Sequence, residues 1–193
     1  YTITLTVGSS TGGVSKVERE VSVHARGDFA KFADTVLEPN FEAVRVAQKG
    51  NSPIGSWYSL EEHPDNLFLR VHGDTAVGLK VTNPEFPLVR RPLPSEGDWS
   101  IQTDLSLEAI QVGDFYTGLL VETIAGGDPV NFAFGLEDGK TLTAKKSNSS
   151  SYSTVRSQNF SAGEVTVRIR RTGNTLLFEH RTSAKSPWTE TAR

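Results

Sequence analysis

The nearest approach to a catalytic acid pair in this sequence is Asp104 and Glu108, which lie on one predicted strand. Alternate residues of a strand share a face, so the two side chains would point the same way. A straight strand separates their Cα atoms by roughly 13 Å. The paired carboxyls of glycosidases lie about 5–5.5 Å or about 6.5–9.5 Å apart. The spacing therefore favours a solvated strand face over a catalytic centre.

Other signals for catalysis are also weak. The four histidines have no zinc-ligand spacing, and the chain has no cysteine. A nucleophile elbow and a phosphate-binding loop are both missing from the sequence. We therefore expect no catalytic residue and no cofactor in this chain, although it could belong to a larger protein with a catalytic domain elsewhere.

Aromatic and planar polar side chains are the groups that could do chemistry here, because together they suit sugars. The apolar CH face of a sugar packs on aromatic rings, and its hydroxyl pairs suit amides, carboxylates and guanidinium groups. The competing interpretation is structural: Trp57 and Trp99 begin strands and could pack in a core, and the arginines could form a solvated sheet face. The ligand-binding candidates are Trp57, Tyr58, Tyr116, Glu122, Asn131, Arg168 and Arg170. Further aromatic candidates are Trp99, Tyr152 and Trp188.

Composition limits the partners. The 193 residues carry a net charge of −3, which gives no basic footprint for nucleic acid or an anionic membrane. Apolar stretches are only a handful of residues long, too short for a transmembrane helix. The absence of cysteine excludes disulfides and leaves the cellular compartment open.

The elements that must position these groups are strands. Period-two alternation dominates the chain, and Asp138-Gly139 and Gly173-Asn174 are typical hairpin turns. Residues 29–37 could form at most one helical turn, and the serine-rich stretch 145–153 reads as an exposed connection. We predict an all-β, two-sheet antiparallel jelly-roll sandwich. Its predicted strands are 41–46, 57–60, 67–72, 88–93, 99–107, 115–122, 130–136, 142–146, 152–160, 164–171 and 175–181.

The first 24 residues predict a hairpin, with alternation over 1–7 and 17–23 across a Gly/Ser-rich turn. Tyr1-Thr-Ile-Thr-Leu-Thr-Val7 and Val21-Ser-Val23 resemble the last two strands of a PKD (polycystic kidney disease) domain, an immunoglobulin-like sandwich. The resemblance implies that residues 1–25 are the C-terminal hairpin of a truncated PKD-like domain. It also implies that the chain is a piece of a larger modular protein.

Residues 28–193 resemble a concanavalin A-like jelly-roll domain of the type at the carboxy end of bacterial β-xylosidases. The family usually closes with two further strands after the tryptophan, which implies truncation at the carboxy end as well. It also implies that Trp188 fills the core and that a structural calcium could be held by Asp28, Asp34 and Asp74. The matching pieces are Phe32-Ala-Asp34, Phe41, Trp57-Tyr-Ser-Leu60, Pro64-Asp-Asn66, Leu67-Phe-Leu69, 117–122, Phe132-Ala-Phe134, Leu142, 165–174 and Trp188.

These resemblances imply a non-catalytic carbohydrate-binding or accessory module of a secreted, multidomain bacterial protein that acts on polysaccharides. The expected partners are a glycan and neighbouring domains of the same chain, outside the cell or at its surface. Two alternatives stay open: a structural spacer that braces a neighbouring glycoside hydrolase, and a divergent glycosidase of the jelly-roll class. Fold alone does not choose among them.

Overall fold

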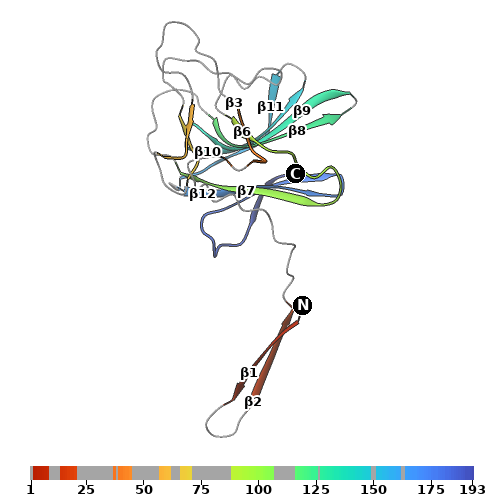
Figure 1. Cartoon of the computed structure of the whole chain (residues 1–193). Coiled ribbons are helices and arrows are strands. Elements are labelled where there is room, and N and C mark those ends of the chain that lie inside the picture. Colours follow the sequence, from red (N-terminus) through yellow and green to blue (C-terminus); the bar gives the residue numbers. More distant parts are fainter. Residues whose placement is uncertain are drawn as a thin grey trace.

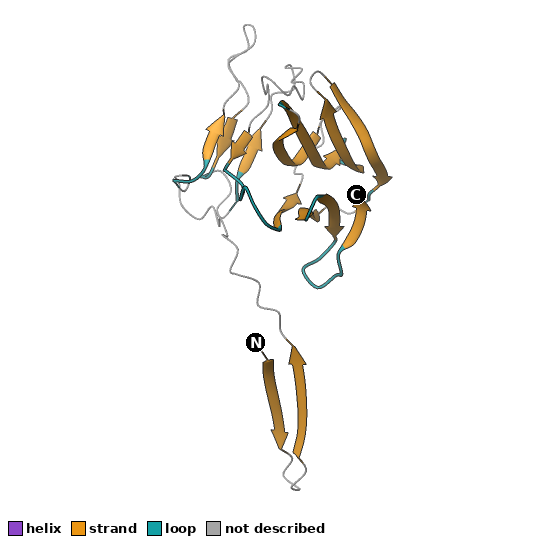
Figure 2. Cartoon of the chain, turned by 90° about the vertical axis from the view of Figure 1, so that its right-hand side faces the viewer, coloured by secondary structure: helices purple, strands orange, loops and turns teal. Residues whose placement is uncertain are grey.

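The computed structural model describes residues 2–8, 14–20, 37, 39–44, 57–61, 66–70, 88–106, 116–125, 127–148, 151–161 and 164–193. None of these residues is helical, as the strand pattern predicts (Figure 2). No helix in this part of the chain could therefore cross a membrane. The predicted helical turn, the three aspartates Asp28, Asp34 and Asp74, and the histidines His24, His63 and His72 lie outside the described residues.

Two four-stranded antiparallel sheets form the sandwich, stacked as two layers in Figure 1. The first sheet has the strand order β11-β10-β9-β8 and the second has the order β14-β13-β12-β7. The first contains β8 (Tyr116–Ala125), β9 (Asp128–Glu137), β10 (Thr141–Asn148) and β11 (Ser151–Asn159). The second contains β7 (Trp99–Ser106), β12 (Glu164–Thr172), β13 (Thr175–Arg181) and β14 (Thr189–Ala192).

Three short antiparallel ladders accompany the sandwich. The predicted N-terminal hairpin forms from β1 (Thr2–Gly8) and β2 (Val14–Glu20), with Leu5 opposite Val17. A second ladder pairs β3 (Glu42–Val44) with β6 (Leu88–Arg90). The third pairs β4 (Trp57–Ser59) with β5 (Phe68–Arg70). The predicted strands therefore exist; β6 ends earlier than predicted, at Arg90, and β9 and β10 are longer than predicted.

Turn chemistry fixes the registers of the long hairpins. Asp138 and Gly139 both have positive φ, 54° and 63°, and with Lys140 they form a three-residue turn between the paired Glu137 and Thr141. The N–H of Lys140 donates to the carbonyl of Glu137 at 3.2 Å and closes that turn. Gly173, with φ of 57°, turns β12 into β13 in the same tight manner. These two turns set which residues face the core.

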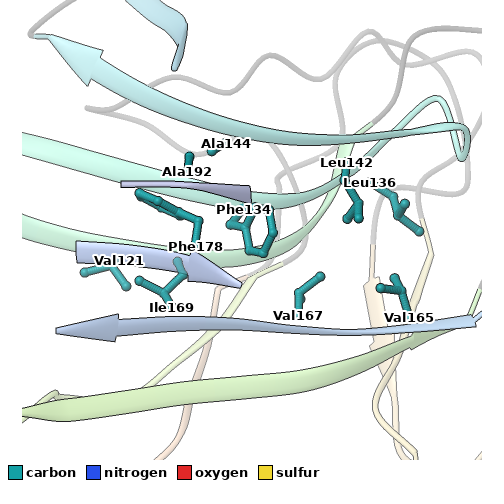
Figure 3. Close-up of a cluster of buried hydrophobic side chains, with 10 residues drawn as sticks. All are labelled: Val121, Phe134, Leu136, Leu142, Ala144, Val165, Val167, Ile169, Phe178 and Ala192. Carbon is teal, nitrogen blue, oxygen red and sulfur yellow. The ribbon is translucent and has the colours of Figure 1, made fainter. Parts of the chain in front are cut away.

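The core lies between the two sheets, where apolar side chains from both layers meet (Figure 3). Phe134 and Phe178 pack edge to face, with ring centroids 5.7 Å apart and planes at 70°. Trp99 packs against this cluster, as predicted for a tryptophan that begins a strand. The buried members are Val121, Phe134, Leu136, Leu142, Ala144, Val165, Val167, Ile169, Phe178 and Ala192.

Three expectations from the sequence were wrong. Strand β14 has no counterpart among the predicted strands, because Thr-Glu-Thr-Ala carries almost no apolar alternation. The serine-rich stretch 145–153 is mostly strand, with β10 continuing to Asn148 and β11 starting at Ser151. Trp188 is half-buried outside the core, against the guanidinium groups of Arg168 and Arg181.

Strands β8 and β9 come unusually close at Gly118 and Gly135, which face each other in the register. A Cβ added to either glycine would lie 2.6 Å from the Cα of the other. We expect Gly135→Ala to lower the free energy of unfolding by about 1–3 kcal/mol, because the added methyl group overpacks the ladder. Chemical denaturation measures this, with exposed Ser157→Ala of the same sheet as the control. Equal stability of the two variants would contradict the close approach.

His180 is buried where the two sheets meet. Its Nδ1 lies 2.9 Å from Thr191 Oγ1 and its Nε2 lies 3.4 Å from Gln158 Nε2. The ring packs edge-on against Phe160, with centroids 6.1 Å apart. Burial lowers the pKa of His180, although a hydrogen bond that the ring donates to the backbone of Thr189 partly opposes this.

This lowered pKa predicts a loss of stability in mild acid. The unfolded chain binds the proton at its usual pKa of about 6.5, while the folded chain resists it. The stabilising contribution is therefore present above that pH and is lost as the pH falls through the lower, folded pKa. Unfolding free energies measured from pH 7.5 to pH 5 should decline less steeply for His180→Gln than for the unchanged chain. Parallel pH profiles would rule out this role for His180.

Candidate functional site

Each strand of the first sheet has a core-facing side and an outer side, because successive side chains alternate. On β9, Phe132 and Phe134 face the core, so Asn131 and Gly135 lie on the other side. We call this side the outer face of the first sheet. Three of the predicted ligand-binding residues, Tyr116, Glu122 and Asn131, lie on it.

A row of four polar side chains crosses that face at one end, one from each strand. Glu122 of β8 is opposite Asn131 of β9, and Ser147 of β10 is opposite Tyr152 of β11. The Asn131 backbone N–H donates to Ser147 Oγ at 2.8 Å. The Asn131 Nδ2 donates to the Tyr152 hydroxyl at 3.3 Å. We call Glu122, Asn131, Ser147 and Tyr152 the polar row.

The polar row has unused hydrogen-bonding capacity. Asn131 is only 2 % exposed, and its Oδ1 has no hydrogen-bond partner among the described residues. Buried polar atoms are usually satisfied by protein, water or ligand. Glu122 is exposed at the end of the row, so its carboxylate can accept hydrogen bonds from outside. The row therefore presents the exposed carboxylate of Glu122 and the half-buried phenol of Tyr152 to a polyhydroxylated ligand, with the buried Asn131 Oδ1 behind them.

The protonation of Tyr152 suits the same role. Burial raises the pKa of its phenol, the hydrogen bond from Asn131 opposes this, and the negative charge of Glu122 adds to the rise. The hydroxyl therefore stays protonated at neutral pH and can donate as well as accept a hydrogen bond. The β3–β6 ladder reaches the same region: Glu42 chiefly, and Glu122 to a smaller extent, raise the pKa of Arg90 on β6.

Tyr116 lies at the other end of the outer face and is already held by the protein. Its hydroxyl donates to the carbonyl of Thr143 at 3.0 Å, and the Lys145 ammonium lies 5.2 Å from its ring centroid. Lys145 in turn forms an ion pair with Glu137. Along β8, six residues separate Tyr116 from Glu122, a span of about 20 Å. Tyr116 is therefore outside the polar row and is bound in a structural cluster.

The predicted arginines lie on the opposite side of the sandwich, on the outer face of the second sheet. Arg168 and Arg170 both bind the carboxylate of Glu179, with N–O distances of 2.9 Å and 3.2 Å. Arg168 also stacks on Trp188, with its guanidinium carbon 3.8 Å from the ring centroid. The structure therefore separates the arginines from the polar row, and the seven candidates cannot form one site.

The remaining candidates are only partly described. Trp57 and Tyr58 lie in strand β4, but their side chains are outside the described residues. Glu108 is also outside them. Asp104 accepts a hydrogen bond from the Thr166 hydroxyl at 2.5 Å, which agrees with a structural strand position. No group of metal-ligating side chains occurs in the described part of the chain.

Sequence reasoning missed Ser147 and left Tyr152 among the secondary aromatic candidates. Ser147 is 1 % exposed, although it lies in a serine-rich stretch that resembles a loop. Register places it: Glu137 pairs with Thr141 across a three-residue turn, so Ser147 falls opposite Asn131, whereas a two-residue turn at Asp138-Gly139 would place it opposite Val130. Pairing across strands, more than residue type, identifies the row.

Comparison with known proteins supports the fold only. No protein-family model matches the chain, and no curated protein matches it significantly. Among solved structures, it is similar to the crystal structure of a point mutant of the GH43 protein BlXynB from Bacillus licheniformis. The TM-score is 0.56 at 15 % identity, and the match covers 97 % of this chain and 36 % of that one. The likeness shows the fold alone, a two-sheet antiparallel sandwich of the jelly-roll kind, and this chain spans about a third of the length of the similar protein.

Because Tyr116 is buried, we expect its phenol to ionise at a higher pH than the other tyrosines. Burial raises its pKa well above the usual value, and the charges of Glu137 and Tyr152 add to this. In an alkaline titration followed by phenolate absorbance, Tyr116→Phe should remove the last of the four tyrosine transitions. Because the folded pKa is raised, its contribution to stability should be lost as pH rises above about 10. An unchanged final transition in the variant would show that Tyr116 is not buried.

Proposed function

We propose that the jelly-roll domain is a non-catalytic carbohydrate-binding module of a secreted, multidomain protein that acts on polysaccharides. The single observation that carries this proposal is the polar row, in which Asn131, next to the exposed carboxylate of Glu122, keeps an unpartnered carbonyl oxygen. The glycan would lie across the ends of β8, β9 and β11, on the outer face of the first sheet.

The chemistry of the row matches a sugar better than a charged or apolar ligand. Neighbouring hydroxyls of a pyranose can each donate and accept, and the row offers both functions. Glu122 accepts, and the protonated Tyr152 hydroxyl can do either. Hydrogen bonds to a carboxylate are the stronger kind, roughly twice as strong as neutral ones. We therefore expect Glu122 to contribute most to affinity and Tyr152 to orient the ring.

A binding role fits the carboxylates better than a hydrolytic one. Glycosidases need two carboxyls within about 10 Å, whereas Glu122 and Glu137 lie about 20 Å apart on their face. Glu137 is also neutralised by Lys145. On the other sheet, Glu179 is held by two arginines. This supports an accessory module over a divergent glycosidase.

The likeness to a GH43 protein, a glycoside hydrolase, supports the proposal that this module belongs to a protein that acts on polysaccharides. The match takes in nearly all of this chain but only 36 % of that protein. A module of this size could accompany a hydrolase in one polypeptide and bring it to its substrate. We further propose that the protein is secreted. In this proposal residues 1–25 are a PKD-like hairpin and residues 28–193 are a jelly-roll domain.

One observation favours a second function, in which the module braces a neighbouring domain. It lies on the outer face of the second sheet, opposite the polar row. Trp188 is half-buried between Arg168 and Arg181, with Arg170 next to them. Tryptophan and arginine are enriched where proteins bind each other tightly. The outer face of the second sheet could therefore dock a domain while the polar row holds a glycan.

Two substitutions in the polar row test the main proposal. Glu122→Ala removes an exposed carboxylate, and Tyr152→Phe removes one hydroxyl and leaves the ring. We expect Tyr152→Phe to weaken retention roughly three- to tenfold, the value of one hydrogen bond, and Glu122→Ala to weaken it more. Affinity electrophoresis in soluble plant, algal and bacterial glycans provides the measurement.

Variants on the other side of the sandwich are the controls. Gln102 is exposed on the second sheet, and Gln102→Ala should retain full glycan binding. Arg170→Ala should also retain it if the site is the polar row. Loss of binding in Arg170→Ala alone would move the site to the second sheet. No retention on any glycan would contradict the proposal and favour the bracing role.

A further inference from the structure

A cleft opens between the two sheets at one end of the sandwich, apart from the polar row. Phe132, Lys146 and Val155 contribute its wall on the first sheet, and Leu176 and Phe178 contribute its wall on the second. Arg193 and the β12–β13 turn, at Asn174 and Thr175, complete the rim. We call this the end cleft.

The floor of the end cleft is apolar and aromatic. Phe132 and Phe178 lie with ring centroids 6.4 Å apart and planes tilted by 41°. Val155 is 43 % exposed, one of the few large apolar side chains of the described residues that reach solvent to this extent. Exposed apolar surface beside a concavity is typical of a ligand site.

Two cations stand at the rim of this apolar floor. Lys146 is on the core-facing side of β10, opposite Phe132, and its ammonium lies 5.8 Å from the Phe132 ring centroid. No carboxylate of the described residues forms an ion pair with it. Arg193 pairs with Glu190 at 2.9 Å, and both side chains are largely exposed. Lys146 is itself exposed, so its ammonium is open to an anion that enters the cleft.

We propose that the end cleft binds a small, flat, apolar carboxylate such as an aromatic acid. Its ring would lie against Phe132, Leu176 and Val155, and its carboxylate would meet the ammonium of Lys146. Asn174 and Arg193 would border the open side. This site is on the core side of the first sheet, so it is independent of the proposed glycan site on the outer face.

The size of the cleft agrees with this ligand class. Its volume is about 300 Å³. A ligand the size of cinnamate is small enough to enter such a space. Ligand pockets begin at about this volume, so a whole sugar chain would not enter. The expected affinity for so small a ligand is weak, in the millimolar range.

The test compares cinnamate with cinnamamide, which has the same shape and no charge. Titrations followed by saturation-transfer NMR at low salt should show cinnamate binding roughly three- to fivefold more tightly, the value of an exposed charge pair that the amide lacks. Lys146→Gln should abolish this preference, so that both probes bind equally weakly. Lys140→Gln, an exposed lysine of the β9–β10 turn outside the cleft, should leave the preference unchanged.

A substitution at Phe132 tests the apolar floor of the end cleft separately. Phe132→Leu should weaken cinnamate and cinnamamide alike, because the aromatic contact is common to both. Tyr152→Phe should change neither, which separates this site from the polar row. Equal affinity for the two probes, equal effects of Lys146→Gln and Lys140→Gln, or no binding of cinnamate at millimolar concentration would each overturn the proposal.

Discussion

The edge-to-face packing of Phe134 on Phe178 is the contact on which the arrangement of this domain depends. It joins the centre of the first sheet to the centre of the second and fixes which side of each strand is buried. Since strand side chains alternate, the burial of Phe134 forces Asn131 and Gly135 to the outer side of β9. The core therefore decides where the polar row lies, although no residue of the row touches that ring pair.

The same alternation gives the two outer faces different chemistry. On the first sheet, small residues and hydroxyls occupy the middle of the face, because β8 and β9 come too close at Gly118 and Gly135 for side chains. On the second sheet, two arginines share the carboxylate of Glu179, which consumes their planar donors within the protein. Among the described residues, an exposed carboxylate beside an unpartnered amide oxygen therefore occurs on the first sheet, at Glu122 and Asn131.

Much of this fold can be read from the sequence, and the reason is local. Period-two alternation and the Asp138-Gly139 turn locate most strands and the β9–β10 hairpin without any long-range information, although the register of that hairpin also depends on Lys140 lying in the turn. The rest depends on partners far along the chain. Strand β14 is specified by pairing with β13, and Trp188 leaves the core because Arg168 and Arg181 hold it. Residue types suggested both faces as sites, but only the register shows that Arg170 and Asn131 lie on opposite sides.

Separation of the faces by a packed core has a consequence for function. Two ligands on opposite sides of a rigid sandwich do not compete for space, so a glycan on the polar row and a neighbouring domain on the arginine face could be bound at once. The end cleft lies between the sheets, at the edge of the apolar core that joins the two faces, with Phe178 in its wall. A small carboxylate seated there would contact both sheets. Its binding would therefore favour the packed sandwich over the unfolded chain, and would support both outer faces without touching either.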